Sequence, residues 1–337
     1  MKESIFKPII AITMGDPAGI GPEIILKSLK NPKIYQISRP IVIGSINLLK
    51  SCAKQLGIEI EIKLIDSIAQ ANFQLNCVDL ISVGNYNTPD IKIGEINPTA
   101  GKASIAYIEE STRLALLNQI DGIATAPITK ESLALAGSQL LEHTELLAHL
   151  TESKEVTTIF LVDDVKIFFV TRHLSLKDAV NALNKDLILK TITRADSVMH
   201  ELGYDNYKMA VSALNPHAGE GGLFGNEEIL HIIPAIREAQ NMRINVKGPI
   251  GADSVFHQAL EGKYDCVISL YHDQGHIAAK TYDFYGTITA TLGLPVLRTS
   301  VDHGTGLDIA WKGIANHQSM EKAILACADM VRKMRCK

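Results

Sequence analysis

The stretch that decides the fold is Asp265-Cys266-Val267-Ile268-Ser269-Leu270-Tyr271-His272-Asp273-Gln274-Gly275-His276. Its first half is short, apolar and rich in strand-forming residues, which predicts a buried strand that opens into a loop at His272. Functional groups of open α/β sheets lie beyond the carboxyl ends of the strands. The stretch therefore places a metal-capable imidazole beside a carboxylate at a candidate functional edge.

Short apolar strands alternate with helical stretches along the chain. Strands are predicted at Ile9–Thr13, Pro40–Ile43, Gly122–Thr125, Thr157–Leu161, Val165–Val170, Lys208–Ser212, Cys266–Leu270 and Pro295–Leu297. Helices are predicted at Pro22–Leu29, Ala100–Asn118, Leu176–Leu202, Glu227–Gln240 and Ser319–Met334. This alternation predicts an α/β fold with a mainly parallel sheet. No repeat or low-complexity linker marks a domain boundary, so a boundary near residues 129–132 rests only on the turn at Pro127.

The composition favours an enzyme that works on small molecules. The chain has 337 residues, 46% of them hydrophobic and 21% charged, which is enough for two domains with large cores. A net charge of -4 without a basic block argues against nucleic acid as a ligand, and no apolar run reaches the length of about 18 residues that a membrane span needs. The opening Met1 to Lys7 is too short and polar for a signal peptide, so we expect a cytoplasmic protein. The five cysteines do not show the paired spacing of disulfides or of a zinc ribbon, so we expect them to be reduced and to serve in packing. They are Cys52, Cys77, Cys266, Cys327 and Cys336.

Two further histidines follow apolar runs in the same way as His272. His173 comes after the run 167–170, and His217 comes after the run 209–214. Three imidazoles could bind one ion and leave coordination positions open, as a catalytic site requires, and Asp253 and Asp273 could accept their second N–H groups. The alternative is three unrelated histidines in a chain that has eleven.

Other motifs suggest binding of anions and nucleotides. Gly15 to Glu23 lies between a predicted strand and helix, where it could bind an anion or simply form a tight turn. Ala124 to Lys130 ends a strand with hydroxyl groups and a cation, and Glu142-His143-Thr144-Glu145 follows it as a candidate binding or capping segment. The glycine-rich segment Arg298 to Asn316 could present its backbone to an adenosine, while Asp308 bonds a ribose or caps a turn. Lys280 could act as an acid, a base or an anion contact, or it could be a solvated charge.

Taken in order, these motifs resemble the 4-hydroxythreonine-4-phosphate dehydrogenase (PdxA) family over nearly the full length. The resemblance implies an isocitrate/isopropylmalate dehydrogenase-like fold, with two α/β/α domains flanking an active-site cleft. It implies a first domain of residues 1–130 plus about 299–337 that includes the adenosine loop. The second domain, about 131–298, would hold the metal ligands and the dimer interface. It also implies a homodimer with shared active sites.

The resemblance assigns roles to individual residues. It implies one divalent metal ion (zinc, magnesium or cobalt) on His173, His217 and His272, and NAD as the cofactor, with NADP as the alternative. The implied substrate contacts are His143, Thr144, Lys280, Thr289 and Arg298. The implied catalytic groups are Lys280, Asp253 and Asp273, and the implied cofactor contacts are His303, Gly304, Asp308 and Asn316.

The implied reaction is NAD-dependent oxidation of 4-phosphooxy-L-threonine. Its 3-oxo acid product decarboxylates to 3-amino-2-oxopropyl phosphate in pyridoxal phosphate biosynthesis. Two residues depart from the pattern of the biosynthetic enzymes: Thr289 stands where they usually have Asn, and His276 stands where they more often have an apolar residue. The alternative function is therefore that of a D-threonate or D-erythronate 4-phosphate dehydrogenase in sugar-acid catabolism. Glu142 and Trp311 likewise replace residues that are usually Gly in related sequences. A phosphate acyltransferase or a metabolite sensor is the more remote alternative.

Overall fold

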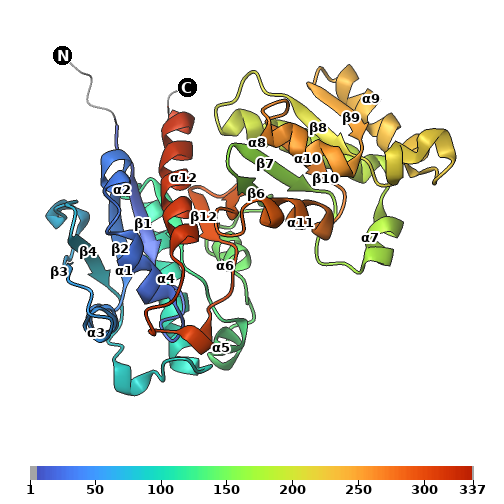
Figure 1. Ribbon diagram of the computed structural model, residues 1–337. Coiled ribbons are helices and arrows are strands. Elements are labelled where there is room, and N and C mark those ends of the chain that lie inside the picture. The colour runs from blue at the N-terminus through green and yellow to red at the C-terminus, as the bar shows by residue number, and fades with distance from the viewer. Residues whose placement is uncertain (1–5, 336–337) are drawn as a thin grey trace, which may run out of the picture. The chain divides into compact units, whose positions relative to one another are not determined.

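A computed structural model describes residues 6–335, and these form two compact units that we treat separately (Figure 1). The first unit contains residues 6–158 together with Ile288–Arg335, and the second contains Ile159–Thr287. The second unit is therefore one continuous segment between two parts of the first. The domain bounds expected from the sequence, 1–130 plus about 299–337 for the first domain and about 131–298 for the second, remain a prediction.

The sheet of the first unit has the strand order β3-β4-β2-β1-β5-β12-β11. Its strands are parallel except for β11, which pairs with β12 in the antiparallel sense. Their bounds are β1 Ile9–Thr13, β2 Arg39–Gly44, β3 Glu61–Leu64, β4 Cys77–Ser82, β5 Gly122–Thr125, β11 Ile288–Leu292 and β12 Leu297–Val301.

Seven α-helices are described in the first unit. Their bounds are α1 Gly21–Ser28, α2 Pro32–Ile37, α3 Ile46–Gln55, α4 Pro98–Leu116, α5 Lys130–Leu135, α6 His143–Leu150 and α12 Gln318–Arg335. The start of α4 follows from its sequence, because the Asn97 side chain accepts hydrogen bonds from the N–H groups of Thr99 and Ala100. Helix α12, red in Figure 1, packs against β12, β5 and β1.

The second unit is built on the strand order β6-β7-β10-β8-β9. Strands β7, β10, β8 and β9 are parallel neighbours, and β6 is antiparallel to β7. The strands are β6 Thr157–Val162, β7 Val165–Phe169, β8 Met209–Ser212, β9 Val246–Ile250 and β10 Cys266–Ser269. The helices are α7 Leu176–Ala182, α8 Lys185–Glu201, α9 Ile233–Asn241, α10 Ala252–Leu260 and α11 His272–Tyr282. A buried apolar cluster that includes Phe160, Ile167, Val255 and Val267 forms its core.

The mixed α/β fold is confirmed, but several predicted bounds are wrong for physical reasons. The helix predicted at Leu176–Leu202 is two helices, because the Asn184 side chain accepts from Leu187 N and caps a new start. The strand predicted at Pro295–Leu297 runs instead from Leu297 to Val301, where a polar strand is buried between β5 and β11. The loop predicted at His272 is the first turn of α11.

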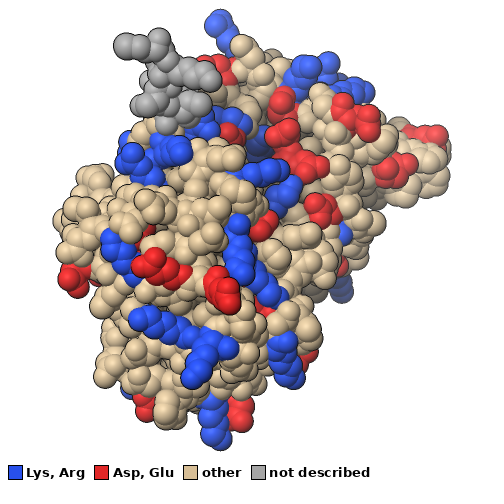
Figure 2. Space-filling model, turned by 60° about the vertical axis from the view of Figure 1, so that its left-hand side comes forward, with Lys and Arg blue, Asp and Glu red and all other residues tan. Residues whose placement is uncertain are grey.

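The described cysteines are unpaired, as the composition predicts. Basic and acidic side chains are interspersed on the face seen in Figure 2. Cys52, Cys77, Cys266 and Cys327 are free and buried, while Cys336 lies outside the described residues, as does most of the segment Met1–Lys7. Among the helices of residues 6–335, none is both long enough and apolar enough to cross a membrane.

Candidate functional site

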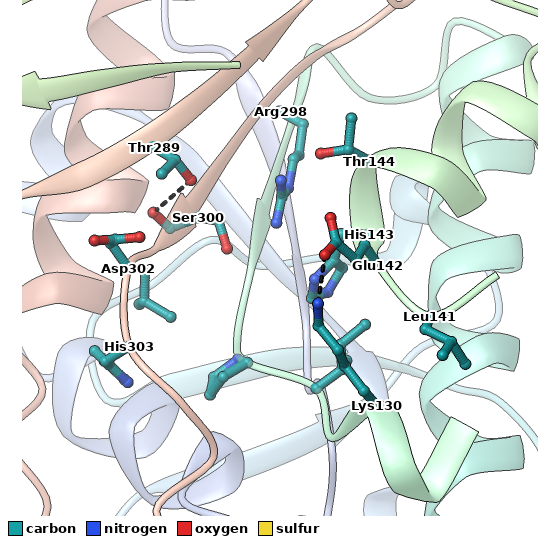
Figure 3. A pocket seen from close by; sticks show the side chains of 13 residues that line it. Lys130, Leu141, Glu142, His143, Thr144, Thr289, Arg298, Ser300, Asp302 and His303 are labelled. Atoms are coloured by element: carbon teal, nitrogen blue, oxygen red, sulfur yellow. Dashed lines mark hydrogen bonds and ion pairs between the residues drawn. The ribbon is translucent and has the colours of Figure 1, made fainter. Parts of the chain in front are cut away.

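A polar pocket of about 270 Å³ lies in the first unit, around the ends of β5 and β12 and the start of α6 (Figure 3). Residues from distant parts of the sequence line it, among them four of the five predicted substrate contacts: His143, Thr144, Thr289 and Arg298. The fifth, Lys280, belongs to the second unit.

Arg298 is the dominant charge of this pocket, although its side chain is buried. Its guanidinium donates to the hydroxyl of Thr125 at 2.9 and 3.1 Å and to that of Thr291 at 3.2 Å. No described carboxylate forms an ion pair with it. Burial lowers the pKa of Arg298 to about 9, so the group stays cationic at neutral pH. A buried cation whose hydrogen bonds go only to hydroxyl groups can bind an oxyanion.

His143 adds a neutral polar group beside this cation. Burial, with the neighbouring Arg298, lowers the pKa of His143 well below its usual range, so the imidazole is uncharged at pH 7. Its Nε2 atom is buried and has no hydrogen-bond partner among the described residues. Because an unpaired buried nitrogen is unfavourable, His143 is suited to bond a ligand in the pocket.

An ion pair between Lys130 and Glu142 forms another wall of the pocket. Figure 3 shows the two side chains directed at one another beside His143, with Asp302 and His303 across the open space. Glu142 also favours the charged form of Arg298. Lys130 forms one ion pair through an ammonium group that has three donors, so it can contact a bound anion beside Arg298.

In the second unit, two of the three predicted metal ligands lie together. His173, His217 and His272 follow β7, β8 and β10, which are adjacent parallel strands, so all three come after strands that end at the same edge of the sheet. The rings of His173 and His272 are 6.1 Å apart between centroids. Both line a pocket with Tyr271 and Asp273.

The His272 ring is held by three neighbours. Its Nδ1 lies 2.6 Å from Asp273 Oδ1, an arrangement in which Nδ1–H donates to the carboxylate and Nε2 keeps its lone pair for a metal ion. The His276 ring stacks on it, with centroids 3.7 Å apart and planes 12° apart. Gln274 fixes the same turn, because its amide accepts from Leu270 N and donates to Ala213 O. These contacts fix the orientation of the His272 imidazole, as a side chain that coordinates a metal ion requires.

His217 lies apart from this pair in a loop with unusual backbone. Residues 217–221 all have positive φ, including the non-glycine residues His217, Ala218 and Glu220. The buried Glu228 holds the loop by accepting from the N–H groups of Leu214 and Asn215. Within residues 6–335 no group of three potential ligands is close enough to hold a metal ion, so the structure does not join His217 to the other two.

The other predicted catalytic groups are also in the second unit. Lys280 lies on α11 with its Nζ 5.5 Å from the centre of the Phe284 ring. Asp253 lies exposed in the first turn of α10. Asp273 contacts His272 Nδ1, a position from which its carboxylate can orient the imidazole.

The predicted cofactor contacts lie in the segment between β12 and α12. Asp308 and Gly304 are exposed, and His303 lines the pocket of Arg298. The Asn316 side chain accepts from Gln318 N at 2.8 Å, so it caps α12. Trp311 is buried, which indicates a packing role.

The Gly15–Glu23 motif is buried, which favours the tight-turn interpretation. A Cβ atom at Gly15 would lie 2.4 Å from Pro127 O, and one at Gly19 would lie 2.6 Å from Thr305 O. The glycines therefore allow close contact between backbone segments.

Several residues of both sites escaped sequence reasoning. Thr125 and Thr291 hold Arg298, Gln274 ties the His272 turn to β8, and Glu228 orders the His217 loop. Two of them lay inside motifs of the sequence: Gln274 in the His-Asp-Gln-Gly-His phrase, and Thr125 in the Ala124 to Lys130 motif.

The pocket of Arg298 should bind inorganic phosphate in a pH-dependent way. Arg298 is cationic below its pKa of about 9 and neutral above it, so affinity is present below this pH and falls about tenfold per unit above it. His143 is neutral throughout this range. Calorimetric titration between about pH 7 and pH 10 checks this, and constant affinity across the range would contradict it.

Comparison with known proteins gives consistent matches over nearly the whole chain. A family profile described as "Pyridoxal phosphate biosynthetic protein PdxA" matches residues 36–327. A protein of Clostridium botulinum strain Hall, named provisionally as a D-threonate 4-phosphate dehydrogenase, is 47% identical over 329 residues, which are 98% of each chain. A relative from Halalkalibacterium halodurans with the same name is 48% identical over 322 residues, 96% of each chain.

A solved structure resembles this one closely. The crystal structure of 4-hydroxythreonine-4-phosphate dehydrogenase from Klebsiella pneumoniae has a TM-score of 0.88 and 40% sequence identity. The match covers 96% of this chain and 100% of that chain. Both sequence and fold therefore point to one family.

Proposed function

Because the chain belongs to the PdxA family, we propose that it oxidises a 4-phosphorylated 3-hydroxy acid with NAD and a divalent metal ion. The chain is a dehydrogenase, an oxidoreductase that acts on a CH–OH group. The observation that carries the proposed substrate class is the buried Arg298 guanidinium, which faces a polar pocket without a carboxylate partner.

Recognition of the substrate follows from the groups in the pocket. Arg298 can bind a phosphate or carboxylate oxygen pair in the bidentate manner of a guanidinium. The neutral His143 and the hydroxyl of Thr144 can add hydrogen bonds without further charge. Lys280 remains the proposed second anion contact.

The residues of the second unit fit a divalent ion in their chemistry. His173 and His272 supply two neighbouring imidazoles, and Asp273 fixes the tautomer of His272. A bound divalent ion would supply Lewis acidity at the substrate hydroxyl. Zinc, cobalt and magnesium remain candidates, and imidazole ligands suit the first two best.

A second copy of the chain would complete the metal site in this proposal. Exposed apolar side chains line the His173–His272 pocket, with exposed fractions of 51% for Leu174, 62% for Leu176 and 64% for Ile277. A homodimer would cover them and let His217 of one copy serve the pair of the other. We also propose that this dimer works in the cytoplasm.

The proposed reaction balances as a two-electron oxidation followed by loss of carbon dioxide. Lys280, or a water molecule, takes the hydroxyl proton while the C3 hydrogen leaves as hydride. NAD accepts that hydride at its nicotinamide. The carbon–carbon bond to the carboxylate of the 3-oxo acid then breaks, carbon dioxide leaves, and a proton is added at C2.

Two substrates fit this chemistry, and we favour D-threonate 4-phosphate. The relatives that carry this name are 46–48% identical, whereas the solved 4-hydroxythreonine-4-phosphate dehydrogenase from Klebsiella pneumoniae is 40% identical. Thr289 lines the pocket with a short hydroxyl group that donates to Ser300 O at 3.5 Å. The family description favours 4-phosphooxy-L-threonine as the second candidate, with pyridoxal phosphate biosynthesis as its pathway.

The direct test is reduction of NAD or NADP by the purified, metal-replete protein with each phosphorylated acid. Oxidation of D-threonate or D-erythronate 4-phosphate, with little activity on 4-phosphooxy-L-threonine, would support the sugar-acid assignment. A preference for the aminated acid would replace it with the second candidate. No reduction with any of them would refute the proposed dehydrogenase substrates and favour a sensor or an acyltransferase.

Thr289→Asn should shift substrate preference toward the aminated acid. The longer amide offers both a donor and an acceptor to the C2 substituent, so the ratio of kcat/KM for 4-phosphooxy-L-threonine over D-threonate 4-phosphate should rise about tenfold or more. Thr289→Val is the matched control, because it adds no amide and should leave that shift absent. An unchanged ratio in Thr289→Asn would remove this residue as a specificity determinant.

A further inference from the structure

The segment between β12 and α12 is attached to α1 by an ion pair whose carboxylate is buried. Glu23 is fully buried, and Lys27 Nζ lies 2.7 Å from its Oε1 atom. Lys27 also donates to the carbonyl oxygens of Gly313 and Ala315, each at 2.9 Å. Glu23 accepts from the N–H groups of the same two residues, at 3.2 and 2.9 Å. Both backbone polar groups of Gly313 and of Ala315 are therefore bound by this pair.

The hydrogen bonding of the pair is complete. An ammonium group has three donors, and those of Lys27 match three acceptors: Glu23 and two carbonyl groups. An ion pair with a buried carboxylate adds little net stability compared with apolar residues of similar size, because that carboxylate loses its hydration. Its strongest effect here is on geometry, since the two charges fix where Gly313 and Ala315 lie.

A second attachment holds the start of the same segment. Ile20 N donates to Thr305 O at 2.9 Å, and Thr129 Oγ1 donates to Thr305 Oγ1 at 3.0 Å. Gly19 permits this contact, because a Cβ atom there would lie 2.6 Å from Thr305 O. The segment is thus fixed at Thr305 and again at residues 313–315.

Side chains between and beside these attachments remain accessible. Asp308 is exposed, and Ile314, which lies between the two bound residues, is 69% exposed. The backbone is fixed while these groups face solvent, which is the arrangement of a preorganised binding loop.

We propose that Glu23 and Lys27 are positioning residues for the dinucleotide: they hold residues 305–316 in the conformation that binds the adenosine portion of the cofactor. This inference rests on the proposed use of NAD and assigns a role to the Gly15–Glu23 motif. In this proposal the motif supports the cofactor-binding segment and does not itself bind an anion.

The test uses the full-length protein and a charge-free replacement of the pair. Lys27→Met alone leaves a buried carboxylate without its partner and risks misfolding, so the informative variant is the double change Glu23→Gln with Lys27→Met. The matched control is Asp329→Asn with Lys333→Met, which removes the same kind of i,i+4 pair from the surface of α12.

Two readouts separate positioning from general structure. In the double variant, amide hydrogen exchange of residues 313–315 without cofactor should be about tenfold faster. The KM for NAD should rise about tenfold, with kcat at saturating NAD and the KM for the phosphorylated acid nearly unchanged. The control variant should match the wild type in all of these quantities.

Other outcomes overturn the inference in distinguishable ways. Unchanged exchange would show that the pair does not hold the segment. Faster exchange with an unchanged KM for NAD would show a purely structural pair. If the wild type binds neither NAD nor NADP, the proposed function and the positioning role fall together, while exchange still reports whether the attachment exists.

Discussion

Arg298→Met should lower kcat/KM for the phosphorylated acid about 10³-fold, because it removes the buried cation that faces the pocket. The same change should leave the melting temperature equal or higher. A buried guanidinium without a carboxylate partner is unfavourable to the folded state, and methionine fills the space without that desolvation penalty. Steady-state kinetics and thermal unfolding measure the two effects.

The combination of lost activity and retained stability is what identifies a binding residue. Arg113→Met is the matched control, since Arg113 is an exposed residue of α4 that pairs with Glu110, and its replacement should leave both quantities unchanged. A marked fall in melting temperature for Arg298→Met would instead assign Arg298 to the stability of the sheet.

Removal of the divalent metal, or His272→Asn, should abolish nearly all oxidation, with a loss of about 10³-fold or more. His272 has its Nδ1 bonded to Asp273 and its ring near His173, so the asparagine variant loses the imidazole and its fixed geometry together. Metal content of the purified protein and NAD reduction after chelation and metal addition measure the effect.

A second histidine variant controls for general loss of structure. His257→Asn changes an exposed residue of α10 and should keep wild-type metal content and activity. Full activity after exhaustive chelation would exclude a metal-dependent reaction. Full metal content in His272→Asn would place the ion elsewhere.

The edge of the second sheet was predictable in part, because the short apolar runs indicate strands of a mainly parallel sheet, although they do not give the order of those strands. The three runs before His173, His217 and His272 become neighbouring parallel strands, and the carboxyl ends of such strands meet at one edge. Pattern alone could not place His217, because its distance from the other two depends on a loop of left-handed residues and on Glu228.

The pocket around Arg298 was harder to predict from the sequence. Strand β12 contains Arg298, Thr299 and Ser300, and an apolar pattern does not mark such a strand. It is buried through its pairing with β5 and β11, and its side chains bond Thr125 and Thr291 across the sheet. Strand β4 was missed for a similar reason: Asp79 interrupts its pattern, and only the fold reveals that its carboxylate accepts from the N–H groups of Asn72 and Phe73.

The position of β12 in the first sheet has a consequence for synthesis of the protein on the ribosome. Strand β5 ends at Thr125, but its neighbour β12 begins at Leu297, after the whole of the second unit. The continuous segment Ile159–Thr287 can fold once it has emerged, whereas the first unit must wait with an open strand edge. A nascent chain that has emerged from the ribosome only as far as residue 296 should therefore carry a folded second unit and a first unit that recruits chaperones or aggregates.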